Sequence, residues 1–384
     1  MSGPEDKSYA QDTIRDLTER SPRDESLEFR SPSYNRRGPV YAALDLGTNN
    51  CRLLLARPTR RGFRVVDAFS RIIRLGEGVS QTGLLSEAAM DRTIDALKIC
   101  ASKIERAGDC RARLVATEAC RSASNGPHFL DRVRHELGLH IEILTPEEEA
   151  TLAVIGCATL IDMNVDYALV FDIGGGSSEL IWLDLRHISD LGPTGAKKLI
   201  EDIRKGTGSA VWASLPVGVV SIAERFGGQE VTPDLFERMV SYVSELIAPF
   251  ETRHNFRNRI VGKSIHFLGT SGTVTTVAGI KLGLQRYDRN KVDGCWMAVS
   301  DVKRVTYNLL ERSYAERVAE PCIGRDRADL VLAGCAILEA ILREWPCERL
   351  RVADRGLREG ILSSLMMQEK NARSNRNRIG ASKK

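Results

Sequence analysis

The sequence predicts an α/β protein built from two similar halves that face each other across a cleft. Two stretches predict this fold, because Asp45-Leu46-Gly47 and Asp172-Ile173-Gly174 each follow an apolar strand-length run and precede a small polar turn and a second run. The same order of a strand, the residues Asp-apolar-Gly, a turn and a second strand thus occurs twice in one chain. This repetition indicates an internal duplication, since glycine turns of ordinary α/β proteins usually lead into a helix. A cleft between two such halves is a favoured place for a ligand.

Length and composition limit the class of protein. The chain has 384 residues, of which 42% are hydrophobic, which is enough for two domains with cores and too polar for a membrane protein. It has neither a long apolar run nor a signal pattern at its N-terminus, so we expect a cytoplasmic protein without a membrane partner. Nine cysteines without a CxxC pair argue against a disulfide framework and against a cysteine zinc site.

The two ends of the chain differ in composition from the region between them. Residues 1–38 are rich in Ser, Pro and charged side chains, which predicts a flexible leader, and residues 369–384 predict a basic disordered tail. Between them we expect an N-terminal domain over residues 39–155 and a C-terminal domain over residues 156–368. The net charge of +4 is small and no aromatic residues interleave with the basic tail, so we expect no specific nucleic-acid partner.

The remaining elements follow from the spacing of apolar residues and from helix caps. Ser86 is expected to cap a helix that ends near Gly108, because Glu87 in the first turn favours the exposed N–H groups. Residues 194–225 and 232–253 are predicted to be helical. Two apolar helices, ADLVLAGCAILEAILREW and LREGILSSLMM, close the chain and could bury a dimer face, so we expect a homodimer.

Both predicted hairpins carry groups that suit a phosphate. Glycine lets backbone N–H groups approach an anion closely, and Ser, Thr and Asn side chains add donors. Either turn alone is more often structural, because Gly-Asn turns are routine in hairpins, but the pair favours a phosphate site. Carboxylates at the strand ends could hold Mg²⁺ directly or through water, and Glu179 inside the returning strand could reach the same ion, the alternative being a polar position that points outward. The phosphate candidates are Gly47, Thr48, Asn49 and Asn50 in the first hairpin and Gly174, Gly175, Gly176, Ser177 and Ser178 in the second, and the metal candidates are Asp45, Asp172 and Glu179.

The stretch TPEEEA at 145–150 separates the roles of consecutive glutamates. Thr145 as N-cap, Pro146 at the first helical position and Glu148 three residues after the cap form a capping box. Glu149 lies about 100° further round the helix and is free to face another surface. A carboxylate beside a phosphate can deprotonate water, and nearby anions raise its pKa toward the useful range. We therefore expect Glu149 to be the general base; the alternative is a solvated acid favoured by the helix dipole.

Two further candidates for phosphate binding lie between strands and helices. Arg121 follows a strand, from which a guanidinium could hold phosphate oxygens at two points, although such arginines are usually surface residues. In GTSGT, Gly269, Ser271 and Gly272 have the composition of a turn that meets phosphate at a helix N-terminus. The six histidines lack zinc spacing, and the G-x-S-x-G elbow and the Walker and NAD fingerprints are missing, so zinc, serine-hydrolase and NAD chemistry are disfavoured.

Six motifs together resemble one family. DLGTNNCRLLLA, ATEACRSASN, IEILTPEEEA, FDIGGGSSELI, LGTSGT and DRGLREGIL occur in the order and rough spacing of the exopolyphosphatase / guanosine pentaphosphate phosphatase family (Ppx/GppA). The resemblance covers about residues 40–366. DLGTNN or DIGGGS alone would indicate only the wider group of actin-like ATPases. The combination with EEA and GLREG is more specific.

The resemblance implies an actin-like fold of duplicated ribonuclease-H-like domains and Mg²⁺-dependent removal of terminal phosphate from inorganic polyphosphate or guanosine pentaphosphate. It implies a catalytic base at Glu149, phosphate binding by Arg121 and by the glycines of both hairpins, and acids of the phosphate and metal site at Asp172 and Glu179. Long family members continue into further helical domains, whereas this chain stops soon after GLREG. Short chains or alarmones are therefore expected as substrates rather than long polymers processed without release.

Two other functions fit the same fold, because fold alone does not settle function. A kinase of this fold would move phosphate from ATP to a small acceptor. A sensor of alarmones or polyphosphate would close on its ligand with little turnover and signal through the flexible ends. The sequence does not rank polyphosphate against guanosine pentaphosphate.

Overall fold

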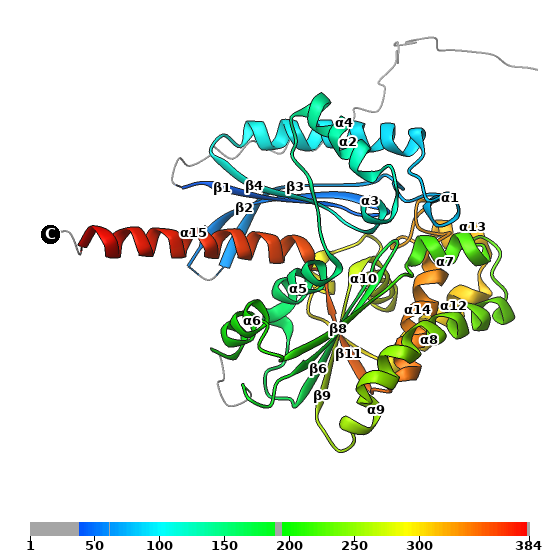
Figure 1. The fold of residues 1–384 in the computed structure, drawn as a ribbon. Helices are drawn as coiled ribbons and strands as arrows, with labels where there is room; N and C mark the ends of the chain where they lie inside the picture. The colour runs from blue at the N-terminus through cyan, green and yellow to red at the C-terminus, as the bar shows by residue number, and fades with distance from the viewer. Residues whose placement is uncertain (1–37, 61, 189–193, 382–384) are drawn as a thin grey trace, which may run out of the picture. The chain divides into compact units, whose positions relative to one another are not determined.

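Two mixed β-sheets organise the chain, each with helices on both faces (Figure 1). The computed structural model describes residues 38–381 apart from 61 and 189–193, so the predicted leader lies almost entirely outside the described residues. The first sheet has the order β3-β2-β1-β4-β5, with β1 Val40–Leu46, β2 Asn50–Thr59, β3 Gly62–Ile72, β4 Cys110–Ala116 and β5 Glu142–Ile143. The second has the order β10-β11-β9-β6-β7-β8, with β6 Tyr167–Ile173, β7 Ser178–Asp184, β8 Ala210–Leu215, β9 Ile265–Thr270, β10 Trp296–Ala298 and β11 Arg349–Ala353.

The two sheets repeat one topology. In each, a first strand pairs antiparallel with a second, the second pairs antiparallel with a third, and a fourth lies parallel on the other side of the first. The first hairpin sets Asp45 opposite Arg52, and the second sets Asp172 opposite Glu179 in the same register position. Among the described strands, β10 of the second sheet has no counterpart in the first. The predicted actin-like duplication of ribonuclease-H-like halves is therefore confirmed.

Alternating side chains bury both faces of the first sheet. Leu44 and Leu53 pack with Phe129 under the helices of one face, and Tyr41 and Leu54 pack on the opposite face. This alternation follows from the two-residue period of a strand. The helices of this part are α1 Val79–Thr82, α2 Glu87–Arg106, α3 Glu118–Ser122 and α4 Gly126–Leu137, and α2 begins at the predicted cap Ser86, whose side chain accepts from the Ala89 N–H.

The second sheet holds the larger core. Phe171, Trp182 and Phe267 on one face pack under the long helices, while Val170 and Ile181 face the other group of helices. Burial of these apolar side chains is the main stabilising contribution. The helices are α5 Pro146–Cys157, α6 Gly195–Lys205, α7 Val219–Phe226, α8 Pro233–His254, α9 Phe256–Arg259, α10 Ser271–Lys281, α11 Arg289–Val292, α12 Val299–Glu311, α13 Tyr314–Ala319, α14 Val331–Glu344 and α15 Leu357–Ala381, with a 3₁₀ turn η1 at Ala158–Leu160.

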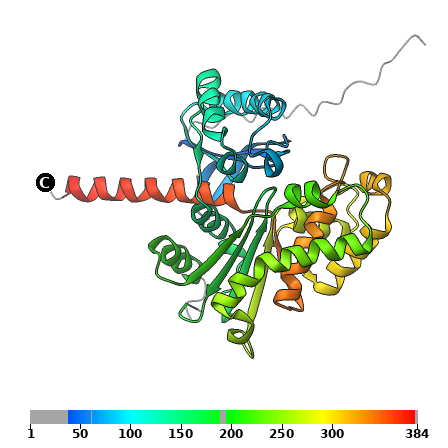
Figure 2. The same cartoon turned by 45° about the vertical axis from the view of Figure 1, so that its right-hand side comes forward.

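Helices α5 and α15 lie between the two sheets and pack against each other (Figure 2). Their crossing depends on glycine: a Cβ at Gly156 would lie 1.9 Å from the Gly356 carbonyl oxygen, and a Cβ at Gly360 would lie 1.9 Å from the Leu152 oxygen. Larger residues would force the helices apart. The crossing thereby joins the halves and places the start of both helices beside the hairpins.

The final helices differ from two expectations. Helix α15 runs to Ala381, so most of the segment expected to be a disordered tail is helical, while the division of the chain into domains stays a prediction. The apolar residues of α14, and Ile361 and Leu362 of α15, are buried within the chain, so they offer no free dimer face. The homodimer stays a prediction without that support. None of the described helices is both long and apolar enough to cross a membrane.

Candidate active site

The two glycine turns have the same internal hydrogen bond. The Gly47 N–H donates to the Asn50 carbonyl and the Gly174 N–H donates to the Ser177 carbonyl, both at 2.9 Å. These residues occupy equivalent positions of the two hairpins, directly after the β1 and β6 strands. The duplication therefore includes the backbone hydrogen bonding of the turns.

The turns touch each other across the cleft. A Cβ at Gly175 would lie 2.9 Å from Thr48 Cβ and 3.1 Å from the Asn49 nitrogen, and a Cβ at Gly176 would lie 2.8 Å from Thr48 Oγ1. Since real side chains do not tolerate such distances, glycine is required at both positions for this close approach. The backbones of both halves can thus reach one small anion.

A cavity lies at the meeting point of the two hairpins, the start of α5, the start of α10 and the start of α15. It collects most of the residues predicted from sequence, but Arg121, Ser178 and Gly269 do not line it, and the Ser178 hydroxyl instead donates to the Val217 carbonyl at 2.7 Å. A Cβ at Gly269 would lie 2.7 Å from the Phe171 ring, so this glycine is explained by packing rather than by a ligand. The predicted residues that line the cavity are Asp45, Gly47, Thr48, Asn49, Asn50, Glu149, Asp172, Gly174, Gly175, Gly176, Ser177, Glu179, Ser271 and Gly272.

The first turn of α5 separates the glutamates as the capping box predicts. The Glu148 N–H donates to Thr145 Oγ1 at 3.2 Å, and Glu148 Oε2 accepts from the Thr145 N–H at 3.3 Å. Glu149 instead turns into the cavity, where its Oε2 accepts from Arg121 Nη1 at 3.0 Å. One residue of helical rotation therefore places Glu148 in the cap and Glu149 in the site.

The cavity raises the pKa of Glu149 to about 7. Burial is the largest cause, because a charged carboxylate loses hydration there, and the negative charges of Asp45 and Asp172 act in the same direction. Arg121 opposes both effects by stabilising the ionised form. A carboxylate with a pKa near neutrality is suited to accept a proton from water.

Three other acids that line the cavity, Asp45, Asp172 and Glu179, are also hard to ionise. Burial raises the pKa of Asp172 to about 6, with help from the charge of Asp45, and burial raises the pKa of Asp45 itself. The pKa of Glu179 lies well above its ordinary value because it is buried and faces Glu149 and Asp172, although Ser214 donates to it at 3.0 Å. So much clustered acid at one place favours a positively charged ligand.

Comparison of this chain with protein families shows to which group of actin-like proteins it is related. Residues 54–369 match the Ppx/GppA phosphatase family. The chain belongs to this family. The match includes the starts of α5, α10 and α15, so it covers most of the cavity that the geometry identifies.

Individual relatives agree with the family. A guanosine-5'-triphosphate,3'-diphosphate pyrophosphatase from Photobacterium profundum is 27% identical over 329 residues, which is 85% of this chain and 59% of that protein. The crystal structure of the Ppx/GppA family member from Aquifex aeolicus is 28% identical with a TM-score of 0.68, covering 86% of this chain and 98% of that one. An exopolyphosphatase from Cytophaga hutchinsonii, at 23% identity, shares the fold with a TM-score of 0.73 over 86% and 98% of the two chains.

Arg121 of this Ppx/GppA chain lies behind the base rather than on the cavity wall. Its guanidinium donates to Glu149 at 3.0 Å, to Glu118 Oε2 at 3.0 Å from Nε, and to the Leu144 carbonyl at 2.8 Å. These bonds fix the orientation of the Glu149 carboxylate. The sequence identified Arg121 but not its partner Glu118, which lines the cavity.

Several buried polar atoms of the turns have no hydrogen-bond partner among the described residues. They are Asn49 Oδ1, Asn50 Oδ1 and Ser271 Oγ. Ser271 also has a φ of 89°, which is unusual for a residue with a side chain, and it begins α10, whose N-terminus has no side-chain cap. Unsatisfied polar atoms at a buried site indicate groups that meet a ligand.

The fit of a divalent cation can be tested on these donors. Among the described residues no three acidic, histidine or cysteine side chains converge closely enough to hold a metal by themselves. Mg²⁺ is usually held by one or two carboxylates, with water and substrate phosphate oxygens completing its shell. One or two of the cavity acids Asp45, Asp172 and Glu179 fit this mode of binding, in which the protein provides only part of the ligand set.

Arginines of the cavity were not predicted from sequence. Arg52, Arg327 and Arg358 line it together with the predicted acids. Burial lowers the pKa of Arg358, while Glu359 and Asp45 nearby favour its charged form. The motif DRGLREG contains Arg358, but no spacing in the sequence indicates that it lies beside Arg52 of β2. The fold alone brings them together.

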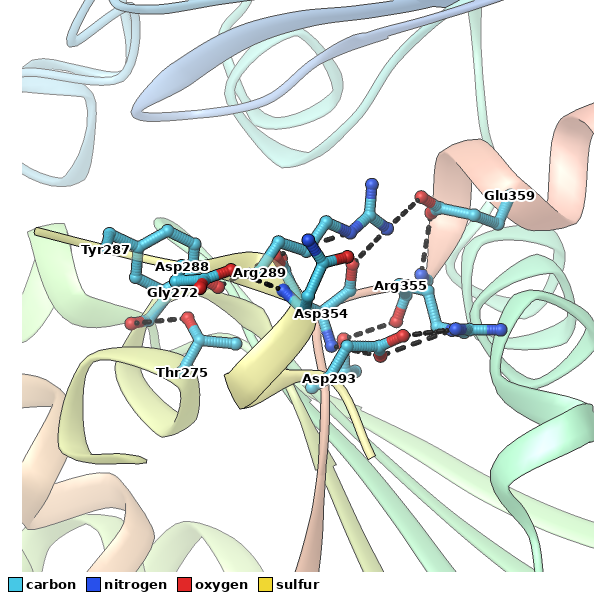
Figure 3. Close-up of polar contacts among 12 residues, drawn as sticks. Gly272, Thr275, Tyr287, Asp288, Arg289, Asp293, Asp354, Arg355 and Glu359 are labelled. Carbon is cyan, nitrogen blue, oxygen red and sulfur yellow. Dashed lines mark hydrogen bonds and ion pairs between the residues drawn. The ribbon is translucent and has the colours of Figure 1, made fainter. Parts of the chain in front are cut away.

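A polar network holds the loop that precedes α15 (Figure 3). Glu359 Oε2 accepts from the Gly356 N–H at 2.9 Å, and its Oε1 accepts from Arg289 Nη2 at 2.8 Å. Asp293 accepts from Arg355 Nε at 2.9 Å. These bonds fix the start of α15, and with it Arg358, against the second half.

Proposed function

We propose that this chain is a Mg²⁺-dependent phosphoanhydride hydrolase that releases terminal phosphate from inorganic polyphosphate, from guanosine pentaphosphate or from both. One observation carries the proposal: two equivalent glycine turns touch across a cavity that also holds Glu149, whose pKa is raised to about 7. The turns supply an anion site and Glu149 supplies a base. The chain spans 59% of the length of its pyrophosphatase relative. The substrates are therefore proposed from the residues of this chain's own cavity and are not taken over from the relative.

The reaction follows from the groups that line the cavity. Glu149 accepts a proton from a water whose oxygen attacks the terminal phosphorus, while the bond from that phosphorus to the bridging oxygen breaks and the shortened chain leaves. N–H groups of both turns, with the Thr48 and Ser177 hydroxyls, donate to the charge that grows on the transferred phosphoryl group. One or two of the carboxylates Asp45, Asp172 and Glu179 would hold Mg²⁺, which when bound would supply positive charge to the phosphate oxygens.

Arg121 serves the base and the phosphate from one position in this proposal. It already donates to Glu149, and a guanidinium there adds positive charge beside the reacting phosphate. Arg52, Arg327 and Arg358 extend the positive charge along the cavity, which suits a substrate with several phosphates. We propose the cytoplasm as the compartment, because nine cysteines without a CxxC pair argue against a disulfide framework.

The test is a phosphate-release assay on short polyphosphate, long polyphosphate and guanosine pentaphosphate, each with Mg²⁺ and with a chelator. We expect Mg²⁺-dependent release of inorganic phosphate without any acceptor. Release that requires an acceptor would instead identify a kinase. Tight binding without turnover would identify a sensor.

A further inference from the structure

A short segment of the first half reaches across to the second half outside the cavity. Arg74, just after β3, donates from Nη1 to Asp329 Oδ2 at 2.9 Å and from Nη2 to Asp329 Oδ1 at 3.1 Å. The two-point pair is partly buried, with side-chain exposures of 35% for Arg74 and 17% for Asp329. Neither residue lines the cavity. Such a pair is stronger and more directional than an ordinary surface ion pair.

A second contact joins the same two parts of the molecule. Glu224 of α7 accepts from the Gly78 N–H at 2.7 Å through Oε1 and from the Ser80 hydroxyl through Oε2. Gly78 has a φ of 77°, so the chain turns there in a way that favours glycine. We call the Arg74–Asp329 pair and the Glu224 contacts together the latch.

The latch is connected directly to the first glycine turn. The Ile73 and Arg74 N–H groups donate to the Asn49 carbonyl at 2.9 and 3.1 Å, and the Gly76 N–H donates to the Thr48 carbonyl at 2.9 Å. Arg74 has a φ of 48°, an unfavourable backbone conformation for arginine, and strain of this kind persists where function needs it. Arg92 supports this conformation by donating to the Ile73 carbonyl at 3.1 Å.

The opposite side of the latch is connected to the second glycine turn. Helix α7, which carries Glu224, begins with the Val219 and Val220 N–H groups donating to the carbonyls of Gly174 and Gly175 at 3.0 and 2.8 Å. Asp329 lies against the segment that directly follows this helix, because a Cβ at Gly228 would lie 2.0 Å from its carbonyl oxygen. The first side of the latch is therefore bonded directly to its turn, and the second side reaches its turn through α7.

We propose that the latch sets the distance between the two glycine turns, so that Arg74, Asp329 and Glu224 are positioning residues for hydrolysis of the phosphate substrate. The inference rests on the proposed function. A phosphate that needs donors from both turns binds only to the closed arrangement, so its apparent affinity falls with the closed fraction. Bound substrate itself favours closure, so a broken latch raises KM and leaves kcat nearly unchanged.

Charge reversal tests the pairing. We expect R74D and D329R each to raise KM for short polyphosphate about tenfold with kcat within about twofold, and R74D/D329R to return KM to within about twofold of the parent. Arg132 and Asp91 provide the control, since their 2.7 Å ion pair lies wholly within the first half. R132D, D91R and their combination should leave KM unchanged. The inference is overturned if the Arg74 and Asp329 variants keep the parent KM, or if the double variant does not recover it. It is also overturned if the control variants change KM as much as the Arg74 and Asp329 variants do.

Amide hydrogen exchange of the full chain without substrate gives a readout that does not depend on hydrolysis. We expect faster exchange at the Gly76 and Gly78 N–H groups in R74D, normal exchange there in R132D, and slow exchange again in R74D/D329R. Unchanged exchange in R74D would refute the latch even if the enzyme hydrolyses phosphate. A parent protein that releases no phosphate but shows these exchange rates would refute the proposed function and leave the latch standing.

Discussion

Replacement of Glu149 by Gln tests the base with almost no change of shape. Because burial and neighbouring acids raise the pKa of Glu149 to about 7, kcat/KM of the parent should increase with pH and level off above neutrality. At pH 6 only about one tenth of the carboxylate is ionised, so kcat/KM there should be about tenfold below its plateau. The E149Q variant has no titrating base, so it should lose this rise and fall about 10²–10⁴-fold at the plateau.

Glu148→Gln is the matched control, because it makes the same chemical change one residue earlier in the same helical turn. Glu148 accepts from the Thr145 N–H and does not line the cavity, so E148Q should keep its activity and lose only about 1 kcal/mol or less of stability. The assay is phosphate release over pH 5.5 to 9, with unfolding by denaturant to compare stability. Glu149 is not the base if E149Q keeps more than about a tenth of the parent rate, or if both variants show the same pH profile.

Three further predictions follow from the cavity. Folding raises the pKa of Asp172 from 3.8 to about 6. Between these two pH values the folded state keeps a proton that the unfolded state has lost. The free energy of unfolding of the metal-free protein should therefore fall by up to about 3 kcal/mol as the pH rises from about 4 to about 6. Denaturant unfolding should show a smaller fall in Asp172→Asn; an identical pH dependence would count against the shift. Gly175→Ala should reduce phosphate release at least about tenfold, because its Cβ would meet Thr48 at 2.9 Å and separate the turns, and full activity would show that their contact is dispensable. Arg121→Ala should move the midpoint of the kcat/KM profile above pH 7, since Arg121 lowers the pKa of Glu149, and a shift to lower pH would contradict this role.

Much of the fold could be predicted from local patterns in the sequence. The two Asp-apolar-Gly turns predicted the duplication, because strand, turn and strand are short-range features that depend on neighbouring residues. The capping box distinguished Glu148 from Glu149 for the same reason: both hydrogen bonds lie within one turn of helix. Where the interactions that form an element lie within a few residues of each other, one sequence is enough to predict that element.

Elements set by distant partners were predicted wrongly. Strand β8, Ala210–Leu215, falls in the segment expected to be helical, because its pairing with β7 is a tertiary contact that its own short, mixed sequence does not indicate. Residues 369–381 were expected to be disordered for lack of apolar periodicity, yet they continue α15 beyond the turns that pack on the first sheet. Stability of a helix segment can come from the element that precedes it.

The candidate site shows the same division. Glu149 and the turn residues could be identified from sequence, since each lies within a short motif that has its own chemistry. Arg52 and Arg358 could not, because they lie on a strand and a helix far apart in the chain and only the fold places both on the cavity. Arg121 was expected to bind phosphate, and its contact with Glu118 depends on a side-chain arrangement that spacing alone does not reveal.

The central claim is that water attacks the terminal phosphorus of a phosphoanhydride held between the two glycine turns. A single-turnover reaction in ¹⁸O-labelled water, with tripolyphosphate or guanosine pentaphosphate, Mg²⁺ and no acceptor, tests it most directly. One ¹⁸O atom should appear in each released inorganic phosphate and none in the shortened product, and E149Q should form neither product at a comparable rate. Label in the shortened product, or no release without an acceptor, would contradict the account.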